Sequence, residues 1–103
     1  MAKLFYGTSV EPIVVDDRLL AHVKVVVATK LRRGESFTLS WTHGDDKEDG
    51  RSTVWLHPSI PLRFVFTDPE PAQLSRAWIE VLADSANSSG GLMLVDEPLG
   101  DGR

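Results

Sequence analysis

Cysteine is absent from the 103-residue sequence, which excludes a disulfide framework and a zinc site with thiolate ligands. No apolar run approaches the roughly 20 residues that a membrane-spanning helix needs. The opening residues, Met1 to Leu4, do not have the pattern of a secretory signal peptide. These absences lead us to expect a cytoplasmic protein with no membrane partner.

Basic residues are also few, because 11 Lys and Arg stand against 15 Asp and Glu and give a net charge of −4 at pH 7. Binding to duplex nucleic acid usually depends on Lys and Arg that neutralise phosphates. The composition therefore disfavours a nucleic-acid partner without excluding one. With 42% hydrophobic and 25% charged residues, the chain has the composition of a globular protein, and its length allows one domain with a single core.

The first third of the chain predicts a hairpin followed by a helix. Residues 4–6 and 13–15 are short β-prone runs with turn-forming residues between them. Asp16 or Asp17 can cap a helix whose apolar residues recur at helical spacing, and Gly34 can end it.

The middle of the chain predicts three strands in a meander. Residues 36–42 alternate between apolar and hydroxyl side chains, with Phe37, Leu39 and Trp41 on the apolar side, which is typical of a strand with one buried face. Residues 53–57 form a second strand, antiparallel to the first, and residues 62–66 resume the alternation as a third strand.

The last third predicts a second helix and a final strand. Asp68 is a good N-cap and Pro69 suits the first helical position, so we expect this helix to run from Pro69 to Ala86. Residues 92–95 make the last strand, and residues 96–103 are interpreted as a flexible acidic tail after a domain of residues 1–95. The apolar side of the helix would carry Leu74, Ala77, Trp78, Val81 and Leu82.

The order ββαβββαβ predicts an α+β fold with a single, mostly antiparallel sheet and two helices packed on one face. The other face would be open and could bind a protein partner or a second copy, which makes a non-catalytic interaction module and a homodimer the favoured function. An alternative is that hydroxyl and aromatic residues occur on a solvated face for local packing alone. The candidate binding residues are Thr38, Ser40, Trp55, His57 and Arg63.

Residues 47–50, Lys-Glu-Asp-Gly, match the lysine signature of ATP-dependent nucleotidyltransferases. In the ligase pattern K-x-D-G-x-R the arginine comes two residues after the glycine, whereas here Arg51 follows Gly50 directly. Asp-Gly between two alternating strands is also a common hairpin turn. We therefore interpret the segment as a hairpin tip. An ATP-dependent DNA ligase-like protein with Lys47 as the adenylated lysine is the alternative.

Other chemistry-bearing residues do not select a site by their spacing. His43, Asp45 and Asp46 could bind a divalent ion weakly, but nothing in the sequence enforces a metal cage, and we expect neither a metal nor a cofactor. Ser40 or Ser59 with a histidine could be sought as a catalytic pair, yet no triad stands out. Two prolines in residues 57–61 either fix His57 for a function or shape a corner at a sheet edge.

Three segments carry a resemblance to a known family: KLFYG (residues 3–7), LRRGESF (31–37) and GRSTVWLHPSIPL (50–62). They resemble a family of short, single-domain actinobacterial proteins, and the resemblance covers nearly the whole chain. The family is a domain of unknown function whose members often carry the name ATP-dependent DNA ligase. The resemblance implies a bacterial cytoplasmic protein and supplies no catalytic residue.

Overall fold

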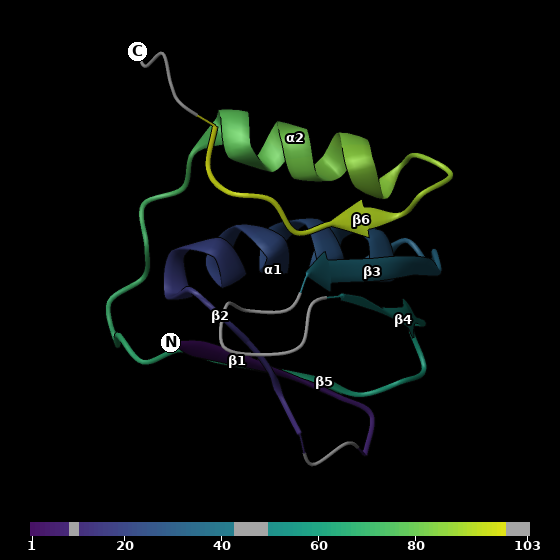
Figure 1. The fold of residues 1–103 in the computed structure, drawn as a ribbon, viewed down its shortest axis with the longest axis horizontal. Helices are drawn as coiled ribbons and strands as arrows, with labels where there is room; N and C mark the ends of the chain where they lie inside the picture. Colours follow the sequence, from purple (N-terminus) through teal and green to yellow (C-terminus); the bar gives the residue numbers. More distant parts are fainter. Residues whose placement is uncertain (9–10, 43–49, 99–103) are drawn as a thin grey trace.

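The computed structural model describes residues 1–8, 11–42 and 50–98, which contain two helices and six strands (Figure 1). The predicted order ββαβββαβ and the α+β class are confirmed. The strands are β1 (Ala2–Tyr6), β2 (Ile13–Val15), β3 (Phe37–Thr42), β4 (Arg51–Leu56), β5 (Leu62–Val65) and β6 (Leu92–Met93), and the helices are α1 (Asp17–Arg32) and α2 (Arg76–Ala86). Neither helix is long and apolar enough to cross a membrane within these ranges.

The strands form two three-stranded sheets, β2-β1-β5 and β4-β3-β6, so the prediction of a single sheet is wrong. Neighbouring strands are antiparallel except β3 and β6, which are parallel. The difference arises at β5, which the meander interpretation placed beside β4. In the structure β5 pairs with β1 instead, with Arg63 opposite Phe5.

A proline-containing corner explains why β5 leaves the meander. Pro58 and Pro61 have no amide hydrogen and cannot continue a β-ladder. The chain turns between them, where the Ile60 amide donates to the His57 carbonyl at 3.0 Å. Beyond the turn, the Gly7 amide donates to the Pro61 carbonyl at 2.9 Å and starts the pairing of β5 with β1. The corner therefore joins the two sheets.

Helix α1 begins and ends as its sequence predicts. The Asp16 carboxylate accepts hydrogen bonds from the amides of Arg18 and Leu19, at 3.0 and 3.3 Å, and so acts as the N-cap. Gly34 follows the helix with a φ of +77°, and its amide donates to the Leu31 carbonyl at 2.9 Å. The helix buries Leu20, Val23, Val26 and Val27.

Helix α2 begins at Arg76, seven residues after the predicted start at Pro69. Its N-cap is Ser75, whose hydroxyl accepts from the Trp78 amide at 3.3 Å. Asp68 caps only a local turn, where it accepts from the Glu70 amide at 2.9 Å. The cause is a second proline, Pro71, because a residue that precedes proline is driven away from the helical conformation.

The buried side of α2 also differs from the predicted one. Trp78, Leu82 and Ala86 are buried, whereas Ala77 and Val81 are exposed. Leu74, which the prediction placed on the apolar side, precedes the helix and is 52% exposed. Only the position of Leu74 follows from the later start of the helix.

The two helices pack against each other, and each also contacts a different sheet. Helix α1 contacts β1 and α2, while α2 contacts β3 and β6. In Figure 1, α2 and β6 accordingly lie at one end of the molecule and β1 and β5 at the other. The prediction that both helices cover one face of a single sheet is therefore wrong. On β3, Phe37 and Leu39 are buried as predicted, whereas Trp41 is only partly buried.

A buried lysine joins the ends of the two helices. The Lys30 ammonium, on α1, donates to Glu35 Oε1 and to Asn87 Oδ1 just after α2, both at 2.8 Å. It also lies 5.4 Å from the centre of the Phe37 ring. The hydrogen bond from Lys30 is the main cause that lowers the pKa of Glu35. Every buried side-chain nitrogen and oxygen in the described residues has a partner.

Candidate functional site

Three of the five candidate binding residues share one side of the β4-β3-β6 sheet. Thr38 and Ser40 lie on β3, and Trp55 lies on β4 directly opposite Thr38. The Trp55 side chain is 56% exposed. Ser40, in contrast, is buried, and its hydroxyl bonds to the Thr53 hydroxyl at 2.7 Å. Ser40 therefore lies on this side of the sheet but offers little area to a partner.

Strand β6 adds a residue that the sequence analysis did not include. Met93 pairs with Ser40 in the parallel register and is 37% exposed. Because paired residues lie on the same side of a sheet, Met93 shares a surface with Thr53, which pairs with Ser40 from the other strand. We call this surface the Trp55 face and define it as Thr38, Thr53, Trp55 and Met93.

The other two candidates lie apart from the Trp55 face. Arg63 is on β5 in the second sheet, with its guanidinium 5.7 Å from the centre of the Phe5 ring. His57 follows β4 in the corner between the sheets. The switch of β5 to the other sheet separates Arg63 from Trp55, and His57 lies beyond the end of β4. For all five residues the assignment to binding stays a prediction.

The corner contains a serine and a histidine in contact. The Ser59 hydroxyl lies 2.8 Å from His57 Nδ1, and the same ring nitrogen accepts from the Ser59 amide at 3.1 Å. Both residues are exposed, and within the described ranges no carboxylate bonds to the imidazole. Nucleophilic catalysis needs a base that a third group orients. The contact therefore serves as a cap of the turn.

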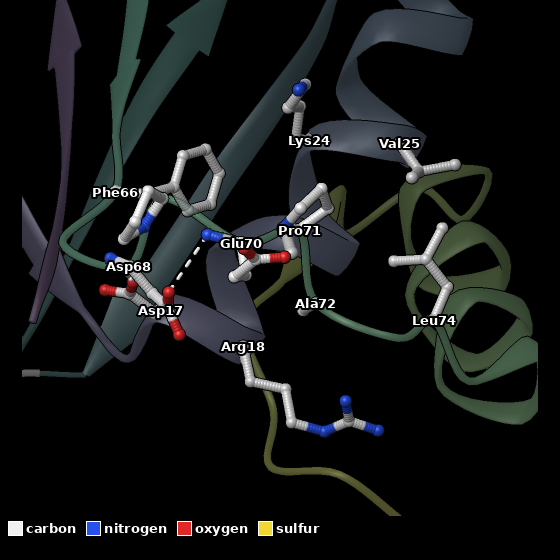
Figure 2. A pocket seen from close by; sticks show the side chains of 12 residues that line it. Asp17, Arg18, Lys24, Val25, Phe66, Asp68, Glu70, Pro71, Ala72 and Leu74 are labelled. Carbon is white, nitrogen blue, oxygen red and sulfur yellow. Dashed lines mark hydrogen bonds between the residues drawn. The ribbon is translucent and has the colours of Figure 1, made fainter.

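Sequence reasoning missed a cleft of about 510 Å³ between α1 and the segment of residues 66–74, which Figure 2 shows from close by. The segment was expected to be helical from Pro69, so no cavity was foreseen there. The residues that line the cleft are Asp17, Arg18, Ala21, Lys24, Val25, Phe66, Asp68, Pro69, Glu70, Pro71, Ala72 and Leu74.

One end of the cleft is held by Asp17. Its carboxylate accepts hydrogen bonds from the Thr67 amide at 3.0 Å, the Thr67 hydroxyl at 2.9 Å and the Asp68 amide at 3.0 Å. Burial by itself raises the pKa of this carboxyl, but the hydrogen bonds outweigh that effect and the pKa is lowered overall. Because Asp16 caps the helix, the adjacent Asp17 is left to bind a segment 50 residues away.

The other end is held by Arg18. Its guanidinium donates to the Gln73 carbonyl at 2.6 Å and makes two hydrogen bonds of 2.9 Å to the Glu97 carboxylate. The guanidinium also lies 5.9 Å from the centre of the Trp78 ring, and Trp78 Nε1 donates to the Val95 carbonyl at 3.1 Å. Glu97 belongs to the predicted tail. The ordered contacts of the chain thus extend to this residue, and the boundary after residue 95 stays a prediction.

His22 connects these elements from inside the protein. The side chain is fully buried, and its ring centre lies 4.5 Å from that of Trp78. Nδ1 donates to the Arg18 carbonyl and Nε2 accepts from the Ser75 amide, each at 2.7 Å. These two partners fix the neutral tautomer with the proton on Nδ1. His22 is therefore a buried link between α1 and the N-cap of α2.

The Arg18–Glu97 pair should stabilise the fold at neutral pH and not in acid. Hydrogen bonds from Arg18 lower the pKa of Glu97 from its ordinary value of 4.5. A carboxyl with a lowered pKa binds fewer protons in the folded state than in the unfolded state. Its contribution to the free energy of unfolding is therefore present above the ordinary pKa and is lost as the pH falls through the pKa of the folded state. The measurement is the thermal midpoint of Glu97→Gln against wild type. We expect a lower midpoint for Glu97→Gln at about pH 7 and a smaller difference at about pH 3.

Glu80→Gln is the matched control for this experiment, because Glu80 is an exposed glutamate on the outer side of α2. Its midpoint should follow that of wild type at both pH values. An equal loss for Glu97→Gln at both pH values would contradict the ion-pair explanation.

The residues behind the nucleotidyltransferase and metal hypotheses lie outside the described ranges. These residues are Lys47, His43, Asp45 and Asp46. Within the ranges that are described, no group of three or more His, Cys, Asp or Glu could hold a metal ion. The hypotheses for Lys47 and for the loop carboxylates therefore stay predictions.

Comparison with known proteins gives a single result. The model of the family described as Domain of unknown function (DUF7882) matches residues 1–97. No curated protein and no solved structure matches the chain.

Proposed function

The chain belongs to the DUF7882 family, a domain of unknown function, and from its geometry we propose that it is a non-catalytic interaction module that pairs with a second copy through the Trp55 face. Trp55 carries this proposal. A tryptophan that is 56% exposed on a strand leaves a large apolar area in water. Tryptophan is also among the residues most enriched at the energetic centres of protein interfaces.

The chemistry of the face supports a second copy as the partner. Thr38, Thr53, Trp55 and Met93 are uncharged, and Arg51 adds a cation at the edge of the same side of β4, although each copy of the protein has a net charge of −4. An uncharged face allows two copies to approach with their acidic surfaces kept apart. In a two-fold arrangement, which is the commonest symmetry of oligomers, Trp55 and Met93 of one copy can contact the same residues of the other copy. The hydroxyls of the two threonines can also face each other across the interface.

Sedimentation equilibrium of wild type and Trp55→Ser tests the proposal. We expect wild type to form dimers, and we expect the substitution to raise the dissociation constant at least about thirtyfold, because a central interface tryptophan contributes about 2 kcal/mol or more. Circular dichroism should be unchanged, since the side chain lies at the surface.

Val14→Ser is the control, because Val14 is a 52% exposed apolar residue of β2 in the other sheet. It should leave the dissociation constant unchanged. A wild-type protein that is monomeric at millimolar concentration would contradict the proposal, as would an equal loss of affinity in both variants.

The second candidate function is a part in ATP-dependent DNA joining, either as a small adenylating enzyme or as an accessory to a larger ligase. It is supported by the letters Lys-Glu-Asp-Gly at residues 47–50. In that reaction the Lys47 amine would attack the α-phosphate of ATP, form a phosphoramidate with AMP and release pyrophosphate. Labelled ATP distinguishes the two functions, because a covalent adenylate that is lost in Lys47→Ala would favour this candidate over the interaction module.

The cellular setting is part of the proposal. The resemblance of residues 3–7, 31–37 and 50–62 supports an actinobacterial origin and a link to proteins that carry the ligase name. The lack of cysteine suits a reducing cytoplasm. Cell fractionation with an antibody to the protein tests the location, and recovery outside the cytoplasmic fraction would contradict it.

A further inference from the structure

The cleft between α1 and residues 66–74 has walls that are fixed before any ligand arrives. The segment is bonded to α1 at Thr67 through Asp17, at Gln73 through Arg18, and at Ser75 through His22. Prolines within the segment restrict its backbone further. A preformed cavity loses little conformational entropy when a ligand binds. Its volume of about 510 Å³ lies in the usual range for small-molecule sites, roughly 300–1,000 Å³.

One part of the cleft is apolar. Val25 on α1 and Leu74 on the segment lie on the same side of the view, with Pro71 and Ala72 beside them (Figure 2). Leu74 is 52% exposed although it points into a concave site. A ligand with an apolar body would remove this side chain and its neighbours from water, which is the main favourable contribution in small-molecule binding.

The other part of the cleft is acidic and has an aromatic wall. The carboxylates of Asp17, Asp68 and Glu70 gather on the same side as the Phe66 ring (Figure 2). The Arg18 guanidinium does not balance them, because it extends away from them and is held by Glu97. The Lys24 ammonium, 5.8 Å from the centre of the Phe66 ring, is the other lining cation. Against the three carboxylates stand the Lys24 ammonium and the N-terminal ammonium, whose charge also lowers the pKa of Asp17. The lining keeps an excess of negative charge, which favours a positive ligand.

We propose that this cleft binds a small organic cation, a protonated amine on an apolar body, with the amine at the Asp17–Asp68–Glu70 end and the body between Val25 and Leu74. The site is independent of the Trp55 face, which lies on the β4-β3-β6 sheet. The proposal therefore does not depend on dimer formation.

Titration of the ¹⁵N-labelled full chain with three matched probes tests the proposal. The probes are 3-phenylpropylamine, 3-phenylpropanol and 3-phenylpropanoate, which share one apolar body and differ in the charge of the head group. We expect saturable shifts of amide signals in residues 17–25 and 66–74. The amine should bind about tenfold or more tightly than the carboxylate, with the alcohol between them.

Two pairs of variants sharpen the test. Ala21→Trp places a ring in the cleft and should abolish the shifts, whereas Ala77→Trp, the same change on the exposed side of α2, should leave them intact. Glu70→Gln should weaken the amine and leave the alcohol unchanged, and Glu80→Gln should affect neither. Glu70 is exposed, so this variant serves even if Ala21→Trp fails to fold. The proposal is overturned by equal binding of amine and carboxylate, by shifts outside the cleft, or by no saturable binding at millimolar concentration.

Discussion

Replacement of Gly91 by alanine should destabilise the fold by about 3 kcal/mol or more, which is among the larger effects of single substitutions. Gly91 has a φ of +82°, in the left-handed region that side chains rarely adopt. A Cβ atom at this position would overlap the Thr38 hydroxyl and lie 2.9 Å from the Thr38 carbonyl oxygen. The hydroxyl can rotate away, but the carbonyl belongs to β3, so the start of β6 would have to move.

Gly34→Ala is the matched control for Gly91→Ala. Gly34 has a similar φ of +77°, but a Cβ atom there would meet nothing within 4 Å. This variant should cost only the backbone strain, about 1 kcal/mol. Urea denaturation measures both free energies of unfolding. Equal losses in the two variants would show that the close approach of Gly91 to Thr38 contributes nothing.

The substitution His22→Phe should lower the free energy of unfolding by about 3 kcal/mol. Phenylalanine keeps an aromatic ring beside Trp78 but has no ring nitrogens. The Ser75 amide would lose its acceptor at 2.7 Å, and the hydrogen bond to the Arg18 carbonyl would also disappear. A partly buried amide without a partner costs about 1–3 kcal/mol, and the second hydrogen bond adds about 1 kcal/mol.

His57→Phe is the control for His22→Phe, because His57 is exposed and water can replace the ring nitrogen that accepts from Ser59. We expect a loss below about 1 kcal/mol in urea denaturation. If both variants lost the same free energy, the buried link through His22 would not stabilise the contact between α1 and α2.

Local signals predicted the elements that depend on local interactions. The Asp16 cap and the Gly34 stop of α1 involve neighbours within four residues, so the sequence contains the information directly. The burial of Phe37 and Leu39 follows from strict alternation within β3. The start of α2 differs from the prediction because two signals oppose each other. Asp68 and Pro69 favour a helix start, whereas Pro71 drives the residue before it away from the helical conformation.

Long-range partners could not be predicted from the same signals. The alternation in β5 is equally compatible with pairing to β4 or to β1, and the pairing with β1 depends on contacts with residues 3–7 that lie far away in the sequence. The cleft depends on hydrogen bonds between Asp17 and Thr67, which are 50 residues apart. Of the predicted binding residues, Thr38, Ser40 and Trp55 meet because they lie on adjacent strands, while Arg63 follows β5 into the other sheet.

Dilution of a ¹⁵N-labelled sample, followed by two-dimensional NMR, tests most directly the claim that the Trp55 face holds two copies together. The claim predicts concentration-dependent shifts at the amides of Thr38, Thr53, Trp55 and Met93, including the Trp55 indole, as dimers separate. Signals from β2 and from the cleft should stay in place. Shifts confined to other surfaces, or spectra that do not change between millimolar and micromolar protein, would contradict it.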